Sequence, residues 1–167
     1  MSAKDEETIR QLIDGQLSWE ELSGDILPDP KDAHRFEVVR SVLQERVDWE
    51  DPILVPLNDH LYAVGTDEGR IVRAECGHDL CSLDENWKEH TEVRVRQSQE
   101  EMEEVYAPNM SPDAEWDMQL REFFCPNCYN LLEVDAAPVG YPVLQKFEPD
   151  IDTFYQEWLD QAPPDRE

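Results

Sequence analysis

Two cysteine pairs, Cys76-Gly-His-Asp-Leu-Cys81 and Cys125-Pro-Asn-Cys128, decide how this chain folds. The first pair has four residues between its cysteines and the second has two. Both spacings allow two thiolates to converge on one tetrahedral ion. Four soft sulfur ligands select zinc, with iron as the usual competitor. We therefore expect one structural Zn²⁺ site, whose ligands are Cys76, Cys81, Cys125 and Cys128.

Other interpretations of these cysteines are weaker. Two disulfides would need an oxidising compartment, and a redox-active pair at Cys125 and Cys128 lacks the βαβ context of such motifs. A Cys₃His site that uses His78 would leave one thiol without a role, so we expect His78 beside the ligands or at the surface. A site of four thiolates has no open coordination position, so it holds a fold together but does not activate water.

No other pattern predicts catalysis. The six glycines form no phosphate-binding loop, so the sequence offers no recognisable nucleotide site. The remaining histidines, His34, His60 and His90, lie among acidic neighbours, and we expect them to be ordinary surface residues. We therefore expect no catalytic residues in this chain.

The first cysteine pair follows a predicted β-hairpin. Residues 61–64 and 71–74 are apolar and rich in β-branched and aromatic types, and they flank the turn-forming tetrapeptide Thr66-Asp-Glu-Gly69. The second strand of this hairpin runs directly towards Cys76, where Gly77 allows a tight turn.

The second cysteine pair lies between two predicted strands. Residues 116–124 alternate between apolar and polar types up to Cys125, and residues 131–134 can form the antiparallel partner. Residues 93–96 also alternate, and Ser98 and Glu101 then form a capping box that begins a short helix. Cysteine pairs placed next to strands in this way are typical of a zinc ribbon.

Helices are predicted at both ends of the chain. Ile9, Leu12 and Ile13 share one face, and Ser18 and Glu21 form a second capping box. A helix over residues 30–47 follows, with Asp29 as its N-cap. Near the C-terminus, residues 151–159 carry apolar side chains at i, i+3, i+4, i+7 and i+8, namely Ile151, Phe154, Tyr155, Trp158 and Leu159. Residues 161–167 are expected to be frayed.

The expected fold is therefore α+β: N-terminal helices, then a zinc-ribbon-like antiparallel β unit, then a C-terminal amphipathic helix. We divide the chain into an N-terminal helical segment at residues 1–50, a β-rich zinc-binding domain at 51–137, and a C-terminal crossing, docking helix and tail at 138–167.

The charge excludes several kinds of partner. Among 167 residues, 14 are Lys or Arg and 40 are Asp or Glu, which gives a net charge of −26. Nucleic acid is excluded because phosphate binding needs a clustered basic surface. A membrane span is not expected, since the most apolar stretch, residues 53–57, is short and contains Pro56. The first residues show no secretory signal, so a cytoplasmic protein with reduced thiols is expected.

Several blocks of sequence, in order along nearly the whole chain, resemble the gamma subunit of acetone carboxylase and of the related acetophenone carboxylase. The blocks are Leu43–Arg46, Trp49–Asp51, Leu54–Leu57, Ala74–Cys81, Glu85–Lys88, Met102–Tyr106, Arg121–Cys128 and Pro149–Leu159. Some relatives carry a further cysteine where this chain has Ala74. If that cysteine is a ligand in the family, the present site needs another donor, for which His78 is available. The four cysteines present suffice without it, so the four-thiolate assignment is kept.

The resemblance implies a small, zinc-containing, non-catalytic subunit of a cytoplasmic ligase with two copies of each subunit type. In that family, large hydantoinase-like subunits hold ATP and any catalytic metal, and they join a ketone and bicarbonate into a β-keto acid. Two alternatives stay open: a free-standing zinc-ribbon adaptor for protein interactions, and a rubredoxin-like iron electron carrier.

Overall fold

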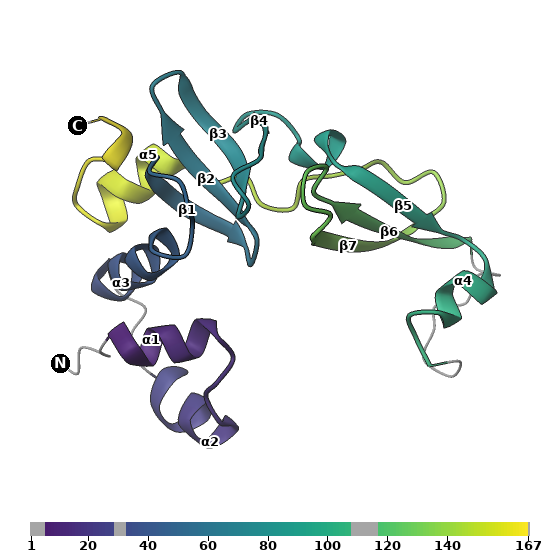
Figure 1. Ribbon diagram of the computed structural model, residues 1–167, viewed down its shortest axis with the longest axis horizontal. Coiled ribbons are helices and arrows are strands. Elements are labelled where there is room, and N and C mark those ends of the chain that lie inside the picture. The colour runs from purple at the N-terminus through teal and green to yellow at the C-terminus, as the bar shows by residue number, and fades with distance from the viewer. Residues whose placement is uncertain (1–5, 29–32, 108–116, 167) are drawn as a thin grey trace.

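The computed structural model describes residues 6–28, 33–107 and 117–166. Helices lie towards both ends of the chain and two antiparallel sheets lie between them (Figure 1). This confirms the α+β fold with a final helix. The predicted N-cap Asp29 and the start of the strand predicted from residue 116 lie outside the described ranges. Within those ranges, no helix has both the length and the apolar character needed to cross a bilayer.

The first sheet has four strands in the order β1-β2-β3-β4. Its strands are β1 (Ile53–Asn58), β2 (Leu61–Thr66), β3 (Gly69–Ala74) and β4 (Asp79–Ser82). Strands β2 and β3 pair in register from Leu61 opposite Ala74 to Thr66 opposite Gly69, which confirms the predicted hairpin. Strand β1, which contains Pro56, was not among the strands predicted. It lies at the edge of the sheet, where a residue without an N–H group is tolerated.

The second sheet has three strands in the order β5-β6-β7. Its strands are β5 (Glu92–Arg96), β6 (Met118–Phe124) and β7 (Leu131–Pro138). All three predicted strands are therefore confirmed, and β6 and β7 are joined directly through the turn that carries Cys125 and Cys128.

Two of the short helical segments begin directly after predicted capping residues, Ser18 and Ser98. Ser18 and Ser98 each accept a hydrogen bond from the backbone N–H of the Glu three residues later, in complete capping boxes. Helix α3 ends at Gln44, so residues 45–47 lie outside it. The helical segments are α1 (Glu6–Ile13), α2 (Trp19–Glu21), η1 (Leu22–Ile26), α3 (Ala33–Gln44), η2 (Trp87–His90), α4 (Gln99–Glu103), α5 (Ile151–Thr153), η4 (Phe154–Trp158) and η5 (Pro164–Arg166).

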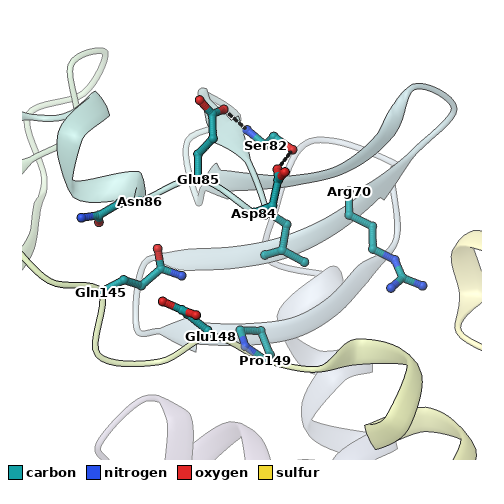
Figure 2. Close-up of a pocket in the computed structure, with 9 residues that line it drawn as sticks. Arg70, Ser82, Asp84, Glu85, Asn86, Gln145, Glu148 and Pro149 are labelled. Carbon is teal, nitrogen blue, oxygen red and sulfur yellow. Dashed lines mark hydrogen bonds between the residues drawn. The ribbon is translucent and has the colours of Figure 1, made fainter.

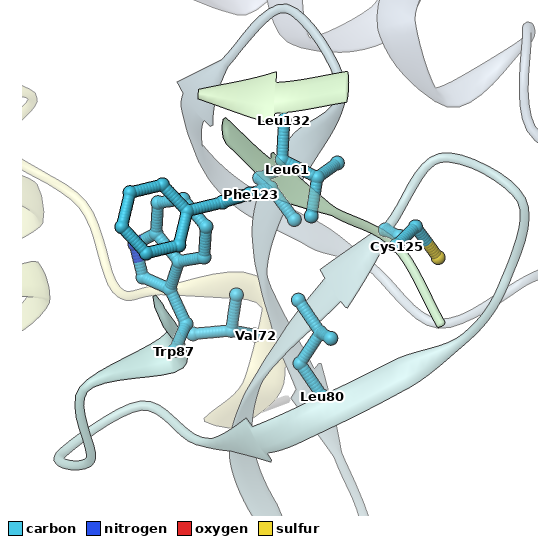
Figure 3. Packing of buried hydrophobic residues seen from close by; sticks show 8 residues of the cluster. Leu61, Val72, Leu80, Trp87, Phe123, Cys125 and Leu132 are labelled. Carbon is cyan, nitrogen blue, oxygen red and sulfur yellow. The ribbon is translucent and has the colours of Figure 1, made fainter. Parts of the chain in front are cut away.

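One hydrophobic cluster joins the two sheets (Figure 3). Trp87 and Phe123 meet edge to face, with ring centroids 6.3 Å apart. Cys125 belongs to the same cluster, and its sulfur points away from the other side chains drawn. The buried members are Leu61, Val72, Ala74, Leu80, Trp87, Phe123, Cys125 and Leu132. Packing of the sheets through this cluster therefore determines where the two cysteine-bearing turns lie.

The C-terminal segment returns to the first sheet. The buried hydroxyl of Tyr155 donates a hydrogen bond of 2.8 Å to the backbone carbonyl of Leu54 in β1. Arg70 in β3 pairs with Asp165 at 2.6 Å and with Asp152 at 2.8 Å. The prediction of a frayed tail is therefore wrong for the described residues of that tail, because a long-range ion pair holds it against the sheet.

Candidate metal centre

The turn that carries Cys76 is tight and closed by backbone hydrogen bonds. The N–H of Gly77 donates to the carbonyl of Ala74 at 2.8 Å, and the N–H of Ala74 donates to the carbonyl of His78 at 2.9 Å. Gly77 has a φ of +85°, which side-chain-bearing residues rarely adopt. A Cβ there would also lie 3.2 Å from Cδ1 of Trp49. Both the backbone conformation and the close approach of Trp49 therefore favour glycine after Cys76.

The turn between β6 and β7 presents the second pair of cysteines. The N–H of Tyr129 donates to the carbonyl of Cys125 at 2.9 Å, and the N–H of Cys125 donates to the carbonyl of Asn130 at 3.0 Å. Cys125 is fully buried and Cys128 is exposed. The pair therefore spans the boundary between the core and the surface.

Three of the four cysteines converge. The sulfur atoms of Cys76, Cys125 and Cys128 all lie within 4.8 Å of one another, and the sulfurs of Cys76 and Cys125 are 3.7 Å apart. Zinc–sulfur bonds of about 2.3 Å in tetrahedral geometry place neighbouring sulfurs about 3.8 Å apart. The three thiols thus fit one tetrahedral ion, and they come from turns attached to different sheets.

Cys81 lies in a different group. Its sulfur and the ligand atoms of Glu85 and His90 lie within 4.8 Å of one another. Cys81 is held in β4, opposite Val72 of β3, whereas Cys76 lies in the turn beyond the end of β3. The set of four thiolates therefore stays a prediction, of which the structure brings three members together. The proximity of Cys81 to Glu85 and His90 was not predicted, although a Cys, a Glu and a His within ten residues can indicate a metal site.

The surroundings of the thiols shift their pKa values in different directions. Hydrogen bonds from the Asn127 side chain and the His78 backbone outweigh the effect of burial, so the pKa of Cys76 is lowered. Burial raises the pKa of Cys128 to about 11. Burial, with the nearby Glu85 and Asp84 carboxylates, raises the pKa of Cys81 to about 11. Without a cation, Cys76 is therefore the most readily ionised of these three thiols.

The fold and the cysteine cluster together define a class: a small α+β protein with a three-thiol candidate metal centre between two sheets. Comparison with known families makes the class specific. The sequence profile described as acetone carboxylase gamma subunit matches residues 47–159, which include all four cysteines. The chain belongs to this family.

Two curated relatives support the assignment. The acetone carboxylase gamma subunit of Xanthobacter autotrophicus (strain Py2) is 42% identical over 160 residues, which cover 95% of this chain and 94% of the relative. The acetophenone carboxylase beta subunit of Aromatoleum aromaticum (strain EbN1) is 30% identical over 114 residues, which cover 66% of this chain and 80% of the relative.

Proposed function

We propose that this chain is the small, zinc-binding and non-catalytic subunit of a cytoplasmic, ATP-dependent ketone carboxylase that joins bicarbonate to a ketone. The 42% identity to an acetone carboxylase gamma subunit over almost the full length of both chains carries the proposal. In it, large hydantoinase-like subunits provide the ATP site and any catalytic metal, while this chain supports the assembly.

In this proposal, Zn²⁺ cross-links the two cysteine-bearing turns and so fixes the two sheets relative to each other. The three converging thiols of Cys76, Cys125 and Cys128 support it, because sulfur ligands at this separation suit zinc. Cys81 is the fourth ligand that spacing predicts, and His78, in the same turn as Cys76, is the alternative.

Metal analysis of the purified chain tests this role. We expect bound zinc in the wild-type protein, and we expect Cys125→Ser to lose both metal and assembly, because removing a buried ligand at such sites generally costs folding. Tyr129→Phe, at an exposed position of the same turn, is the matched control and should keep both. A folded sample without any transition metal, or normal assembly after metal removal, would contradict the proposal.

We further propose that a large carboxylase subunit contacts the groove between α3 and η4. The groove is lined largely by apolar side chains, among them Phe36, Phe154 and Leu159. Trp158 lines the same groove and is 75% exposed, so it extends the apolar lining into a contiguous surface that faces water. The family description calls its members subunits, so we propose that a large partner subunit occupies this groove.

The chain offers a matched pair of tryptophans for the test. Trp158→Ala should weaken co-purification with the large subunits without lowering the stability of the isolated chain. Trp19 is similarly exposed, at 74%, but does not line the groove, so Trp19→Ala should leave co-purification unchanged. Equal effects of the two substitutions would contradict a docking role for the groove. Purification without larger chains would instead favour a free-standing adaptor.

A further inference from the structure

A second group of metal-binding side chains lies apart from the three-cysteine cluster. Cys81 belongs to β4, Glu85 to the following turn, and His90 is the last residue of η2. A thiol, a carboxylate and an imidazole thus present their ligand atoms within 4.8 Å of one another. The distance between Oε1 of Glu85 and Nε2 of His90 is 3.8 Å. One ion can therefore reach all three after small side-chain movements.

We propose that Cys81, Glu85 and His90 form a second binding site, for an exchangeable divalent transition metal of the zinc type. This proposal does not depend on the carboxylase partner. It assigns Cys81 to the second site, and it leaves His78 as the candidate fourth ligand of the three-cysteine site.

Local hydrogen bonds hold the segment that carries these ligands. The N–H of Ser82 donates to Oε2 of Glu85 at 3.2 Å, and the N–H of Glu85 donates to the carbonyl of Ser82 at 3.1 Å. Asn86 caps η2 by accepting from the N–H of Lys88, and its amide donates to the carbonyl of Val143 at 3.0 Å. The chain between the three ligands is therefore short and is held in place by hydrogen bonds.

The types of ligand select the metal. Magnesium and calcium prefer oxygen ligands alone, whereas sulfur with imidazole and carboxylate suits zinc and its neighbours among the transition metals. Glu85 also borders a polar cavity of about 830 Å³, together with Ser82, Asp84 and Asn86 (Figure 2). The carboxylates of Asp84 and Glu85 give this surface a negative charge that attracts a cation.

The exposure of the ligands indicates an exchangeable ion. The side chains of Glu85 and His90 are 53% and 38% exposed, so an ion can enter from solvent. Three protein ligands leave a fourth tetrahedral position open to water, unlike a closed structural site. We therefore expect the second ion to leave before the first during treatment with a chelator.

The test starts from the full-length chain saturated with Zn²⁺, whose total zinc is determined by elemental analysis. Mild chelation then removes the exchangeable ion, and its rebinding is followed by calorimetry. We expect two equivalents in the wild-type chain, and one in both Cys81→Ser and His90→Gln. We expect Glu85→Gln to weaken the second site at least tenfold. His34→Gln is the matched control and should still bind two equivalents, because the α3 residue His34 is in neither group.

Other outcomes are equally decisive. One equivalent in the wild-type chain overturns the proposal, and if Cys81→Ser then binds none, Cys81 is a ligand of the first site. Two equivalents in His90→Gln overturn it as well. If Cys81→Ser does not fold, the exposed His90→Gln variant still decides. Failure of the second site would leave the Cys125→Ser test of the proposed function unaffected.

Discussion

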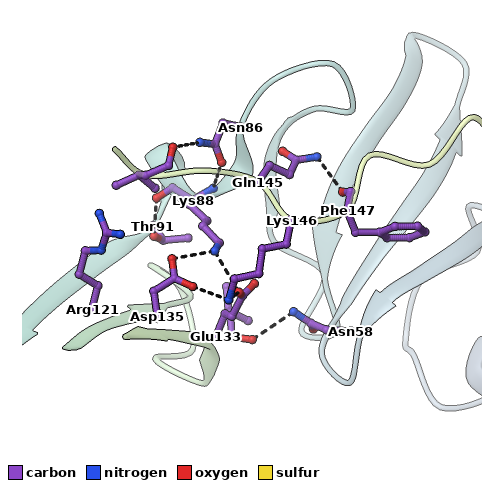
Figure 4. A network of polar contacts seen from close by, with 12 residues as sticks. Asn58, Asn86, Lys88, Thr91, Arg121, Glu133, Asp135, Gln145, Lys146 and Phe147 are labelled. Atoms are coloured by element: carbon purple, nitrogen blue, oxygen red, sulfur yellow. Dashed lines mark hydrogen bonds and ion pairs between the residues drawn. The ribbon is translucent and has the colours of Figure 1, made fainter. Parts of the chain in front are cut away.

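The ammonium group of Lys88 lies 3.0 Å from Oδ2 of Asp135, and the two side chains are only 0% and 7% exposed. Lys88 also pairs with Glu133 at 2.9 Å, and its Nζ lies 4.9 Å from the centre of the Phe123 ring. Lys146 reaches the same carboxylates from the solvent side (Figure 4). This network ties η2 to β7, at the junction of the two sheets.

Replacement of Lys88 by Met should destabilise the protein strongly. The substitution removes the buried charge, but Lys146 still pairs with Glu133 and Asp135 from the solvent side. The loss should therefore reach at most about 3–5 kcal/mol, which is the cost of leaving a buried charge unpaired. Chemical denaturation would measure the change in the free energy of unfolding. Lys146→Met is the control, since Lys146 pairs with the same carboxylates but is 63% exposed, and its effect should be much smaller. Similar losses in both variants would contradict a special role for the buried lysine.

The same network predicts how stability depends on pH. Burial alone would raise the pKa of Asp135, but hydrogen bonds and ion pairs with Lys146 and Lys88 outweigh it and lower the pKa. A carboxyl with a lowered folded-state pKa stabilises the protein fully above its unfolded pKa of about 3.9. That contribution is lost as the pH falls through the folded-state value. The free energy of unfolding should therefore decrease on acidification below about pH 5.

Denaturation curves at several pH values would measure this dependence. Asp135→Asn should be less stable at neutral pH and should show a shallower loss of stability in acid. Asp67→Asn, in the exposed turn between β2 and β3, should retain the wild-type slope. An unchanged slope in Asp135→Asn would show that other carboxyls cause the acid sensitivity.

Features determined by neighbouring residues could be predicted from the sequence. Both capping boxes form because Ser18 and Ser98 need only a Glu three residues away. The strands beside the cysteines follow from local alternation, and Gly77 follows from the tight turn after Cys76. The likeness to acetone carboxylase gamma subunits is also visible in the sequence, because it rests on several ordered blocks and not on the cysteines alone.

Features determined by distant pairing could not be predicted. Spacing allows Cys76 and Cys81 to share an ion, but pairing of β4 with β3 places Cys81 in a ladder, opposite Val72. No local pattern indicates that Arg70 will bind Asp165, 95 positions away. Strand β1 was not among the strands predicted, and only the arrangement of the sheet shows that its Pro56 lies at an edge, where a missing N–H is tolerated.

The docked tail depends on the absence of a side chain at Gly65. A Cβ at this position would collide with the Cβ of Asp165, whose carboxylate pairs with Arg70. Gly65→Ala should therefore displace the tail and lower the free energy of unfolding by about 1–3 kcal/mol, as overpacking generally does. Hydrogen exchange of the backbone amides of Gln161, Ala162 and Asp165 should become faster.

Two further variants separate this clash from a general effect of replacing glycine. Gly24→Ala should change stability little, because no heavy atom outside its own neighbourhood lies within 4 Å of the added Cβ. In Asp165→Gly the colliding carbon is absent, so adding Gly65→Ala to it should cost much less than in the wild-type chain. If Gly65→Ala costs the same in both backgrounds, the strain arises within β2 and not from the returning tail.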